Sequence, residues 1–365
     1  MPVNRRELLT ASALMLAGPA LRVRLAAAGA QAPAHPLVLC WNENPYGPSP
    51  AARAAVAHSI AEGCRYAPQE ELTALEETLA RKEGVSAEQI VIGSGSGELL
   101  CALGLVFGRG GGEFIAAEPT YLELPEYARH QGATTRFVPV DAKLRHDLPA
   151  MRAAVGERTR AVYLCNPNNP TGTALPAADI RAFAQAMPPT VTTLVDEAYM
   201  DFTTGSGVGS VVDLVSQQRV VVLRTFSKIH GMAGLRLGYA IAPQDTAAQL
   251  RHARMSYPNI LAIRAARASL ADTEFLALTR RRILAGRTRI TTELARRGQA
   301  YAEPQGNFVF FDTGMPLKDF AARMQARNIL VGRQFPPYDS WCRVTVGTAS
   351  EVDAFVKALP GALGA

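Results

Sequence analysis

The chain has 365 residues, of which 48% are hydrophobic and 19% charged, a profile of globular proteins that excludes a disordered or collagen-like chain. The net charge is +6, but half of it lies in the first 32 residues and the remaining basic residues are scattered, which argues against nucleic acid as a partner. The five cysteines form no CxxC pair and no metal-ligand spacing, so we expect neither a metal site nor a disulfide framework.

Residues 1–32 have the layout of an export signal. The paired arginines Arg5 and Arg6 precede a short apolar run, and Ala30-Gln31-Ala32 offers a cleavage site. The arginine pair suggests the twin-arginine route, which carries folded cargo, and hence a periplasmic location. The alternative is an uncleaved amphipathic helix, and the protein would then be cytoplasmic.

From about residue 87 to residue 241, apolar strand-like runs alternate with amphipathic helical patterns. The runs are EQIVIG, EFIAAEP, TTRFVPV, RAVYLCNP, TVTTLVDEAY, RVVVLRTFS and LRLGYAIA. This alternation predicts an α/β fold with a mainly parallel sheet sandwiched by helices. Ligands in such folds bind beyond the carboxyl ends of the strands.

Beyond residue 256 the pattern changes to a long helix followed by GNFVFFDT, FAARMQARN, ILVGRQF and WCRVTVGT, which indicates a smaller α+β domain. We therefore expect a large domain over residues 64–256 and a small domain over residues 257–365. Residues 33–63 would form an N-terminal arm that packs with the small domain.

Two features near the start of the large domain are weak signals on their own. The turn GSGSGELL, residues 93–100, lies between a strand-like run and a helical pattern, where free backbone N–H groups can bind a phosphate. Such a turn often serves only as a tight connection. Tyr121, in EPTYLEL, can lay its ring on a flat ligand, although a tyrosine after a strand is usually half-buried packing.

Two further motifs follow strand-like runs and are more specific. The prolines of CNPNNPTG, residues 165–172, make a fixed loop in which Asn169 can donate a hydrogen bond. In VDEAY, Asp196 can face a positive charge and Tyr199 adds a second donor. The plain alternatives are an Asn/Pro turn and an acidic helix cap.

The run TFSKIHGMAGLRLGY places Lys228 just after a strand-like segment. Its neighbours Thr225 and Ser227 are hydroxyl donors, and Arg236 follows eight residues later. A single lysine in a sequence is usually a charged residue that faces solvent. A lysine in a dry pocket beside cations instead loses proton affinity and becomes a nucleophile and base.

These motifs together supply what pyridoxal 5′-phosphate (PLP) needs from a protein. Lys228 would bind the aldehyde as a Schiff base and Asp196 the ring nitrogen, while Asn169 and Tyr199 would donate to O3′. Tyr121 would cover the ring face, and the glycine-rich turn would hold the phosphate.

Eight segments of the chain, taken in order, resemble the fold-type I, class I/II aminotransferases, most closely the histidinol-phosphate aminotransferase branch. They are NENPYGPSP, RYAP, GSGSGELL, PTY, NPNNPTG, VDEAY, SKIHGMAGLRLGY and RVTVGT. The resemblance implies a homodimer in which Tyr66 reaches the phosphate of the partner's cofactor. It implies that Arg343 binds the substrate α-carboxylate, with Asn169 also near the substrate, and that Tyr46 borders the substrate entrance. It also implies a phosphate site made by Ser96, Gly97, Thr225, Ser227 and Arg236.

The resemblance predicts transfer of an amino group between an amino acid and a 2-oxo acid, with Lys228, Asp196 and Tyr199 as the catalytic residues. Two departures concern the substrate. Gly97 stands where the branch often has an acid, and Gly332 followed by Arg333 stands where it usually has arginine. The alternatives are another fold-type I reaction, such as decarboxylation, elimination or racemisation, and a binding protein without turnover.

Overall fold

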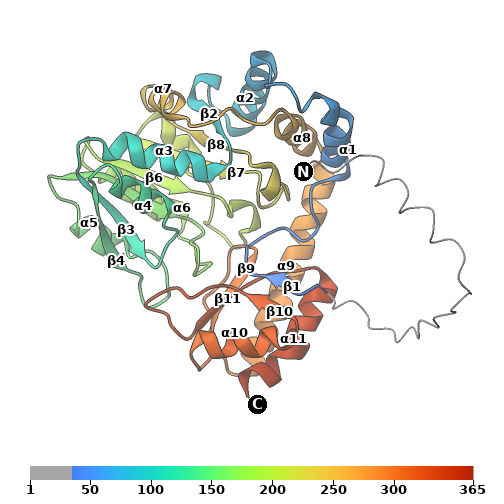
Figure 1. Ribbon diagram of the computed structural model, residues 1–365. Helices are drawn as coiled ribbons and strands as arrows, with labels where there is room; N and C mark the ends of the chain where they lie inside the picture. Colours follow the sequence, from blue (N-terminus) through green and yellow to red (C-terminus); the bar gives the residue numbers. More distant parts are fainter. Residues whose placement is uncertain (1–34, 365) are drawn as a thin grey trace, which may run out of the picture. The chain divides into compact units, whose positions relative to one another are not determined.

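The computed structural model describes residues 35–364, so the export signal predicted for residues 1–32 lies outside the described part. A seven-stranded sheet organises this part of the chain (Figure 1). Its strands are β2 (Ile90–Gly93), β3 (Glu113–Glu118), β4 (Thr134–Pro139), β5 (Thr159–Cys165), β6 (Thr192–Asp196), β7 (Val220–Thr225) and β8 (Gly238–Ile241). Each of the seven apolar runs contributes one strand.

The strand order is β2-β8-β7-β6-β5-β3-β4. Only β8 runs antiparallel to its neighbours, and the other adjacent pairs are parallel. The predicted fold class, a mainly parallel α/β sheet, is therefore confirmed.

Helices cover both faces of the sheet, which explains why its inner strands are mostly apolar, whereas the edge strand β4 is largely exposed. Along β5, Val162 and Leu164 face one core cluster while Tyr163 and Cys165 face the other. The first cluster includes residues of α2 (Gln69–Glu83), α5 (Leu148–Ala153), α6 (Ala177–Gln185) and α8 (Ile260–Ala271). The second includes residues of α3 (Ser96–Gly108), α4 (Glu123–Arg129) and α7 (Gln244–Ala253).

A second group of elements follows α8. It contains α9 (Thr273–Arg296), β9 (Phe308–Asp312), α10 (Leu317–Gln325), β10 (Ile329–Val331), β11 (Trp341–Thr345) and α11 (Ala349–Leu363). Strands β9 and β11 pair antiparallel, and their apolar residues pack with α9, α10 and α11 in a separate core cluster.

The N-terminal arm is divided between the two groups of elements. Strand β1 (Leu37–Leu39) pairs parallel with β10, whereas α1 (Pro50–Ser59) packs on α8. The chain from Pro36 onward forms one compact unit, so the domain limits at residues 63 and 256 remain predictions. Short 3₁₀ helices occupy Ile60–Glu62, Ala87–Gln89, Met200–Phe202, Val212–Ser216 and Ala233–Leu235. Within residues 35–364, no helix combines the length and apolarity needed to cross a bilayer.

Candidate active site

A cavity of about 270 Å³ lies at the carboxyl ends of β5, β6 and β7. Cys165, Asp196 and Thr225, the last residues of these strands, all line it. Of the residues predicted from sequence, the structure brings eleven together around this cavity: Ser96, Gly97, Tyr121, Asn169, Asp196, Tyr199, Thr225, Ser227, Lys228, Arg236 and Arg343. The remaining two, Tyr46 and Tyr66, lie elsewhere.

Lys228 follows β7 after a two-residue turn and points its amine into the cavity. Its Nζ donates to the carbonyl oxygens of Asn42 at 3.0 Å and Trp41 at 3.4 Å. Burial, and then the positive charge of Arg343, lower the pKa of Lys228 to about 8. A substantial fraction of the amine is therefore neutral near physiological pH and able to attack an aldehyde.

Asp196 ends β6 and is almost fully buried. One carboxylate oxygen accepts from the backbone N–H of Ala198 at 3.0 Å, and the other accepts from the Tyr163 hydroxyl at 3.2 Å. Burial raises the pKa of Asp196 to about 6, so the carboxylate is ionised at neutral pH. A protonated ring nitrogen beside it would satisfy this buried charge and hold it ionised.

Arg343 and Asn169 form a hydrogen-bonded pair between β11 and the loop after β5. Arg343 Nη1 donates to Asn169 Oδ1 at 2.6 Å and Nη2 to the Cys40 carbonyl at 2.7 Å. Asn169 Nδ2 then lies 3.5 Å from the Tyr199 hydroxyl, which also accepts from Asn42 Nδ2 at 3.1 Å. Arg343 is buried, and its Nε has no hydrogen-bond partner among the described residues, so the guanidinium can accept a further anion.

The N-terminus of α3 and the segment after β7 form an anion cradle. Gly95 caps α3 with a φ of 90°, and Arg236 Nη2 fills the space that a Cβ at Gly95 would occupy. Arg236 Nη1 lies 3.4 Å from the Ser227 hydroxyl, and Thr225 Oγ1 accepts from Ser227 N at 3.1 Å. Helix amides, a guanidinium and two hydroxyls are suited to a phosphate. The residues present therefore fit PLP at both its phosphate and its ring.

The cavity also contains residues that were not among those predicted to form the site. They are Trp41, Asn42, Thr120, Glu123, Cys165, Ala198, Arg333 and Phe335. Asn42 has a φ of 54°, and its side chain and carbonyl contact Tyr199 and Lys228. Its only sequence signal was its place in NENPYG. Arg333 had a signal as the arginine after Gly332, whose Cβ position lies 2.5 Å from the Arg343 carbonyl.

Tyr46 and Tyr66 do not line the cavity. Tyr46 faces a different groove, where the Arg282 guanidinium lies 5.1 Å from its ring centroid. Tyr66 is 86% exposed, and its ring lies 6.2 Å from that of Tyr257. The roles assigned to these two tyrosines remain predictions.

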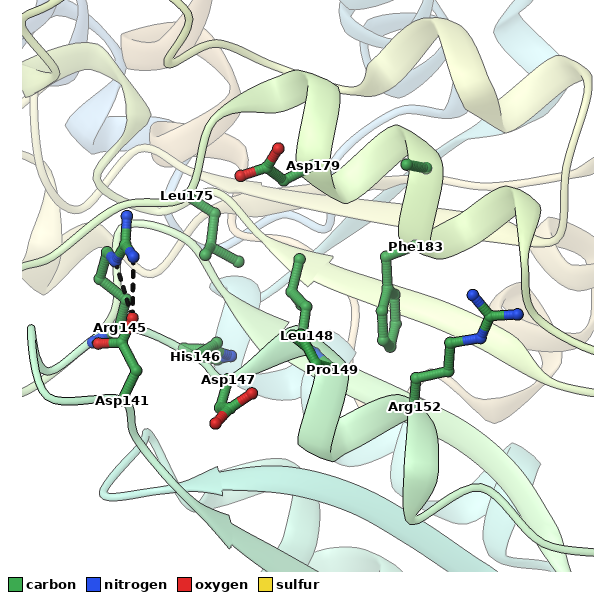
Figure 2. A pocket seen from close by; sticks show the side chains of 11 residues that line it. Asp141, Arg145, His146, Asp147, Leu148, Pro149, Arg152, Leu175, Asp179 and Phe183 are labelled. Atoms are coloured by element: carbon green, nitrogen blue, oxygen red, sulfur yellow. Dashed lines mark hydrogen bonds and ion pairs between the residues drawn. The ribbon is translucent and has the colours of Figure 1, made fainter.

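A larger groove of about 680 Å³ lies beside α5 and α6 (Figure 2). Leu148, Leu175 and Phe183 form its apolar part, and Arg145 at its edge pairs with Asp141 at 2.9 Å. Its lining contains no lysine to bind an aldehyde, and its acid nearest a strand end, Asp141 after β4, is already paired with Arg145. The volume of a cavity therefore does not identify the site in this protein. The residues that line the smaller cavity do.

Comparison with known proteins agrees with this geometry. The sequence profile of the family described as aminotransferase class I and II matches residues 34–359. A histidinol-phosphate aminotransferase of Moorella thermoacetica is 36% identical over 326 residues, which cover 88% of this chain and 84% of the relative. An aromatic amino acid aminotransferase of Rhodococcus jostii is 37% identical over 321 residues, covering 87% and 88%.

A solved structure is similar over the same extent. It is the histidinol-phosphate aminotransferase from Sinorhizobium meliloti in complex with pyridoxal-5′-phosphate, with a TM-score of 0.84 and 29% identity, covering 90% of this chain and 91% of that one. The predicted family resemblance is thereby confirmed over nearly the whole described chain.

Proposed function

This chain belongs to the class I and II aminotransferases and is a PLP-dependent aminotransferase, and from that premise we propose which residues carry out the transfer. The observation that carries the proposal is the presence of Lys228, Asp196 and Arg343 around one cavity, which supplies an amine, a ring-nitrogen partner and a carboxylate site together.

PLP, when bound, supplies an electron sink for the bonding pair at the donor's Cα. Asp196 holds a proton on the ring nitrogen, because its carboxylate is ionised above a pKa of about 6. Asn169 and Tyr199 donate to O3′. Arg343 would bind the α-carboxylate, or the anion in its place, and orient the Cα proton toward Lys228, whose Nζ would act first as the base that removes this proton and then as the acid that returns it.

A single-turnover experiment tests this assignment. The holoenzyme with an amino donor and no amino acceptor should give one equivalent of the donor's oxo product, which is a 2-oxo acid if the donor is an amino acid, and one of pyridoxamine phosphate. Lys228→Ala should give neither at a comparable rate. Release of carbon dioxide, loss of the donor's chirality without transfer, or an elimination product would instead support the alternative reactions of this fold.

For the donor, we propose a compound with a flat side chain and, on the branch where an amino acid has its α-carboxylate, a larger anionic group such as a phosphate. Arg333 supports this choice, because its guanidinium lines the cavity and has no ion pair with an acid among residues 35–364. It lies 4.5 Å from the ring centroid of Phe335. The exposed ring of Trp41 adds a flat surface at the same cavity. Histidinol phosphate, named for several relatives, has both features: a flat imidazole side chain, and a phosphate on the branch where an amino acid has its α-carboxylate. Aromatic amino acids have only a carboxylate on that branch.

The two donor classes are separated by Arg333→Gln. If the donor's anion binds Arg333, the KM for histidinol phosphate should rise about 10-fold or more, while that for phenylalanine stays within about two-fold. Arg152→Gln, in the groove beside α5, is a matched control that should change neither. Efficient use of phenylalanine by both forms, without turnover of histidinol phosphate, would assign the aromatic class instead.

We also propose that the enzyme is a homodimer with Tyr66 reaching the partner's cofactor phosphate. The support is an exposed set of large apolar side chains: Trp41, Ile60, Tyr66, Met255 and Tyr257. Three of these side chains are tyrosine or tryptophan, which are common at protein interfaces. Trp41 also lines the cavity, so an interface over this set would border the active site.

Export by the twin-arginine route is a further proposal, supported by the arginine pair and apolar run within residues 1–32. Replacing Arg5 and Arg6 by lysine should retain the protein in the cytoplasm, whereas the unchanged chain should be recovered from the periplasm. Equal cytoplasmic recovery of both forms would contradict it.

A further inference from the structure

A second carboxylate lies in the cofactor cavity besides Asp196. It belongs to Glu123, the first residue of α4, and no residue of the described chain forms an ion pair with it. Its Oε2 accepts a hydrogen bond of 2.5 Å from the Tyr121 hydroxyl. This is a short hydrogen bond to a charged acceptor, the strongest class in proteins, and it fixes the end of the Tyr121 side chain.

Gly97 provides the space in which the Glu123 carboxylate lies. A Cβ at position 97 would be 2.8 Å from Glu123 Oε2 and 3.3 Å from Cδ. Gly97 is in α3, which packs beside α4, and its φ is not in the left-handed region. Backbone geometry therefore does not require glycine there, and in a helix glycine is less stable than alanine. The contact with Glu123 accounts for it.

Electrostatics agree with this placement. Burial, and then the hydrogen bond to Glu123, raise the pKa of Tyr121 well above its usual value, so the hydroxyl remains the donor at physiological pH. After burial, the charge of Glu123 also raises the pKa of Cys101 on the next turn of α3. The carboxylate thus acts on α3 and on the segment just before α4.

We propose that Glu123 is a positioning residue for the cofactor ring: its carboxylate fixes the Tyr121 hydroxyl, and Gly97 is glycine because any side chain there would displace that carboxylate. The inference rests on the proposed place of Tyr121 at the face of the PLP ring. It joins α3, which supplies the phosphate cradle, to α4 through one half-buried contact.

The test measures PLP binding rather than turnover. Glu123→Ala should weaken PLP affinity about 10-fold and reduce the visible circular dichroism of the bound cofactor, because the Tyr121 ring loses its fixed orientation. Glu123→Gln keeps an acceptor oxygen and should stay within about three-fold of the parent. Glu126→Ala, in the same first turn of α4, is the matched control and should change nothing.

A double-mutant cycle tests the role of Gly97. Gly97→Ala should weaken PLP binding by a factor similar to that of Glu123→Ala, but in the Glu123→Ala background it should have no further effect, because the displaced group is gone. Gly156→Ala, where a Cβ would meet nothing within 4 Å, controls for the added methyl group. Independent, multiplying effects of the two changes would overturn the proposal.

The outcomes separate this inference from the proposed function. If the parent enzyme fails to bind PLP at Lys228, the proposed function itself is wrong. If the parent binds PLP and Glu123→Ala binds it equally well, with the same dichroism, only the role of Glu123 is wrong. Tyr121→Phe should match Glu123→Ala in both measurements, and a clearly different spectrum would also contradict the inference.

Discussion

Lys228 and Arg343 come from distant parts of the chain, and their charges interact across the cavity. Lys228 follows β7, whereas Arg343 lies in the middle of β11. Burial lowers the pKa of Arg343 as well, and its hydrogen bonds to Asn169 and the Cys40 carbonyl keep it in place. A fixed cation near the lysine therefore contributes to the reactivity of the amine before any substrate arrives.

This interaction predicts how PLP capture depends on pH. Because only the neutral amine attacks the aldehyde, covalent capture of PLP by the PLP-free protein should rise through a midpoint near the Lys228 pKa of about 8 and level off above it. Stopped-flow absorbance measures the rate. In Arg343→Gln the midpoint should move upward, since a nearby positive charge is removed. A midpoint near that of free lysine in the parent would contradict the prediction.

Sequence reasoning identified the residues whose type reveals their chemistry. Lys228, Asp196 and Asn169 each follow an apolar run, so the strand-end rule placed them at one edge of the sheet. Glu123 was missed as a cavity residue because a charged residue after a strand is usually solvent-facing, and Arg333 was noted only as a departure from the pattern of the branch. What distinguishes Glu123 is an absent side chain nearby, at Gly97, and only three-dimensional contacts reveal that relation.

At the scale of elements, a buried ion pair holds the ends of β6 and β7 together. Arg224, the residue before Thr225, lies 2.9 Å from the carboxylate of Glu197, the residue after Asp196. Glu83 of α2 lies 3.8 Å from the same guanidinium. Arg224 is thus next in sequence to Thr225 at the end of β7, and Glu197 is next to Asp196 at the end of β6. Both Thr225 and Asp196 line the cofactor cavity.

Breaking this pair should be costly. Arg224→Met leaves the Glu197 carboxylate buried without its partner and should lower the free energy of unfolding by about 3–5 kcal/mol. Arg224→Met with Glu197→Gln should recover part of that loss. Denaturant unfolding of the PLP-free protein measures both. Arg181→Met, which breaks a more exposed pair with Asp213, is the control and should cost about 1 kcal/mol or less.

The capping box of α11 gives a second prediction at this scale. Thr348 Oγ1 accepts from Glu351 N at 3.3 Å, and Thr348 N donates to Glu351 Oε2 at 2.7 Å. Thr348→Ala should therefore lower the free energy of unfolding by about 1 kcal/mol, while Thr348→Ser should be nearly neutral. A urea titration that finds equal loss for both substitutions would assign the effect to the methyl group rather than to the cap.

The inner strands of the large sheet were predictable because both of their faces are buried, which makes each of them a largely apolar run. Their order was not, since the position of β8 between β2 and β7 depends on pairing across about 150 residues of chain rather than on local pattern. The division of the N-terminal arm escaped prediction for the same reason. Its pairing with β10 and its packing on α8 join segments more than 200 residues apart.

At the scale of the whole molecule, a mixing experiment tests the dimer. Lys228→Ala and Tyr66→Phe subunits, each nearly inactive alone, should regain activity when unfolded and refolded together. If Tyr66 serves the partner's site, random pairing makes half of the dimers hybrid, each with one intact site, for about one quarter of parental activity. Activity no higher than that of the Tyr66→Phe protein would show that Tyr66 acts within its own subunit or in neither.

Because β1 pairs with β10, the N-terminal strand can be paired only after the ribosome has made β10. The ribosome makes residues 37–39 well before residues 329–331, so at about 5–20 residues per second β1 waits on the order of tens of seconds for its partner strand. Asn42 lies in the same arm; its carbonyl accepts a hydrogen bond from the Lys228 amine, and its N–H donates to Thr345 of β11. Cofactor loading must therefore follow the synthesis of both β10 and β11, and a bound cofactor would report that these two strands have been made and have reached the arm.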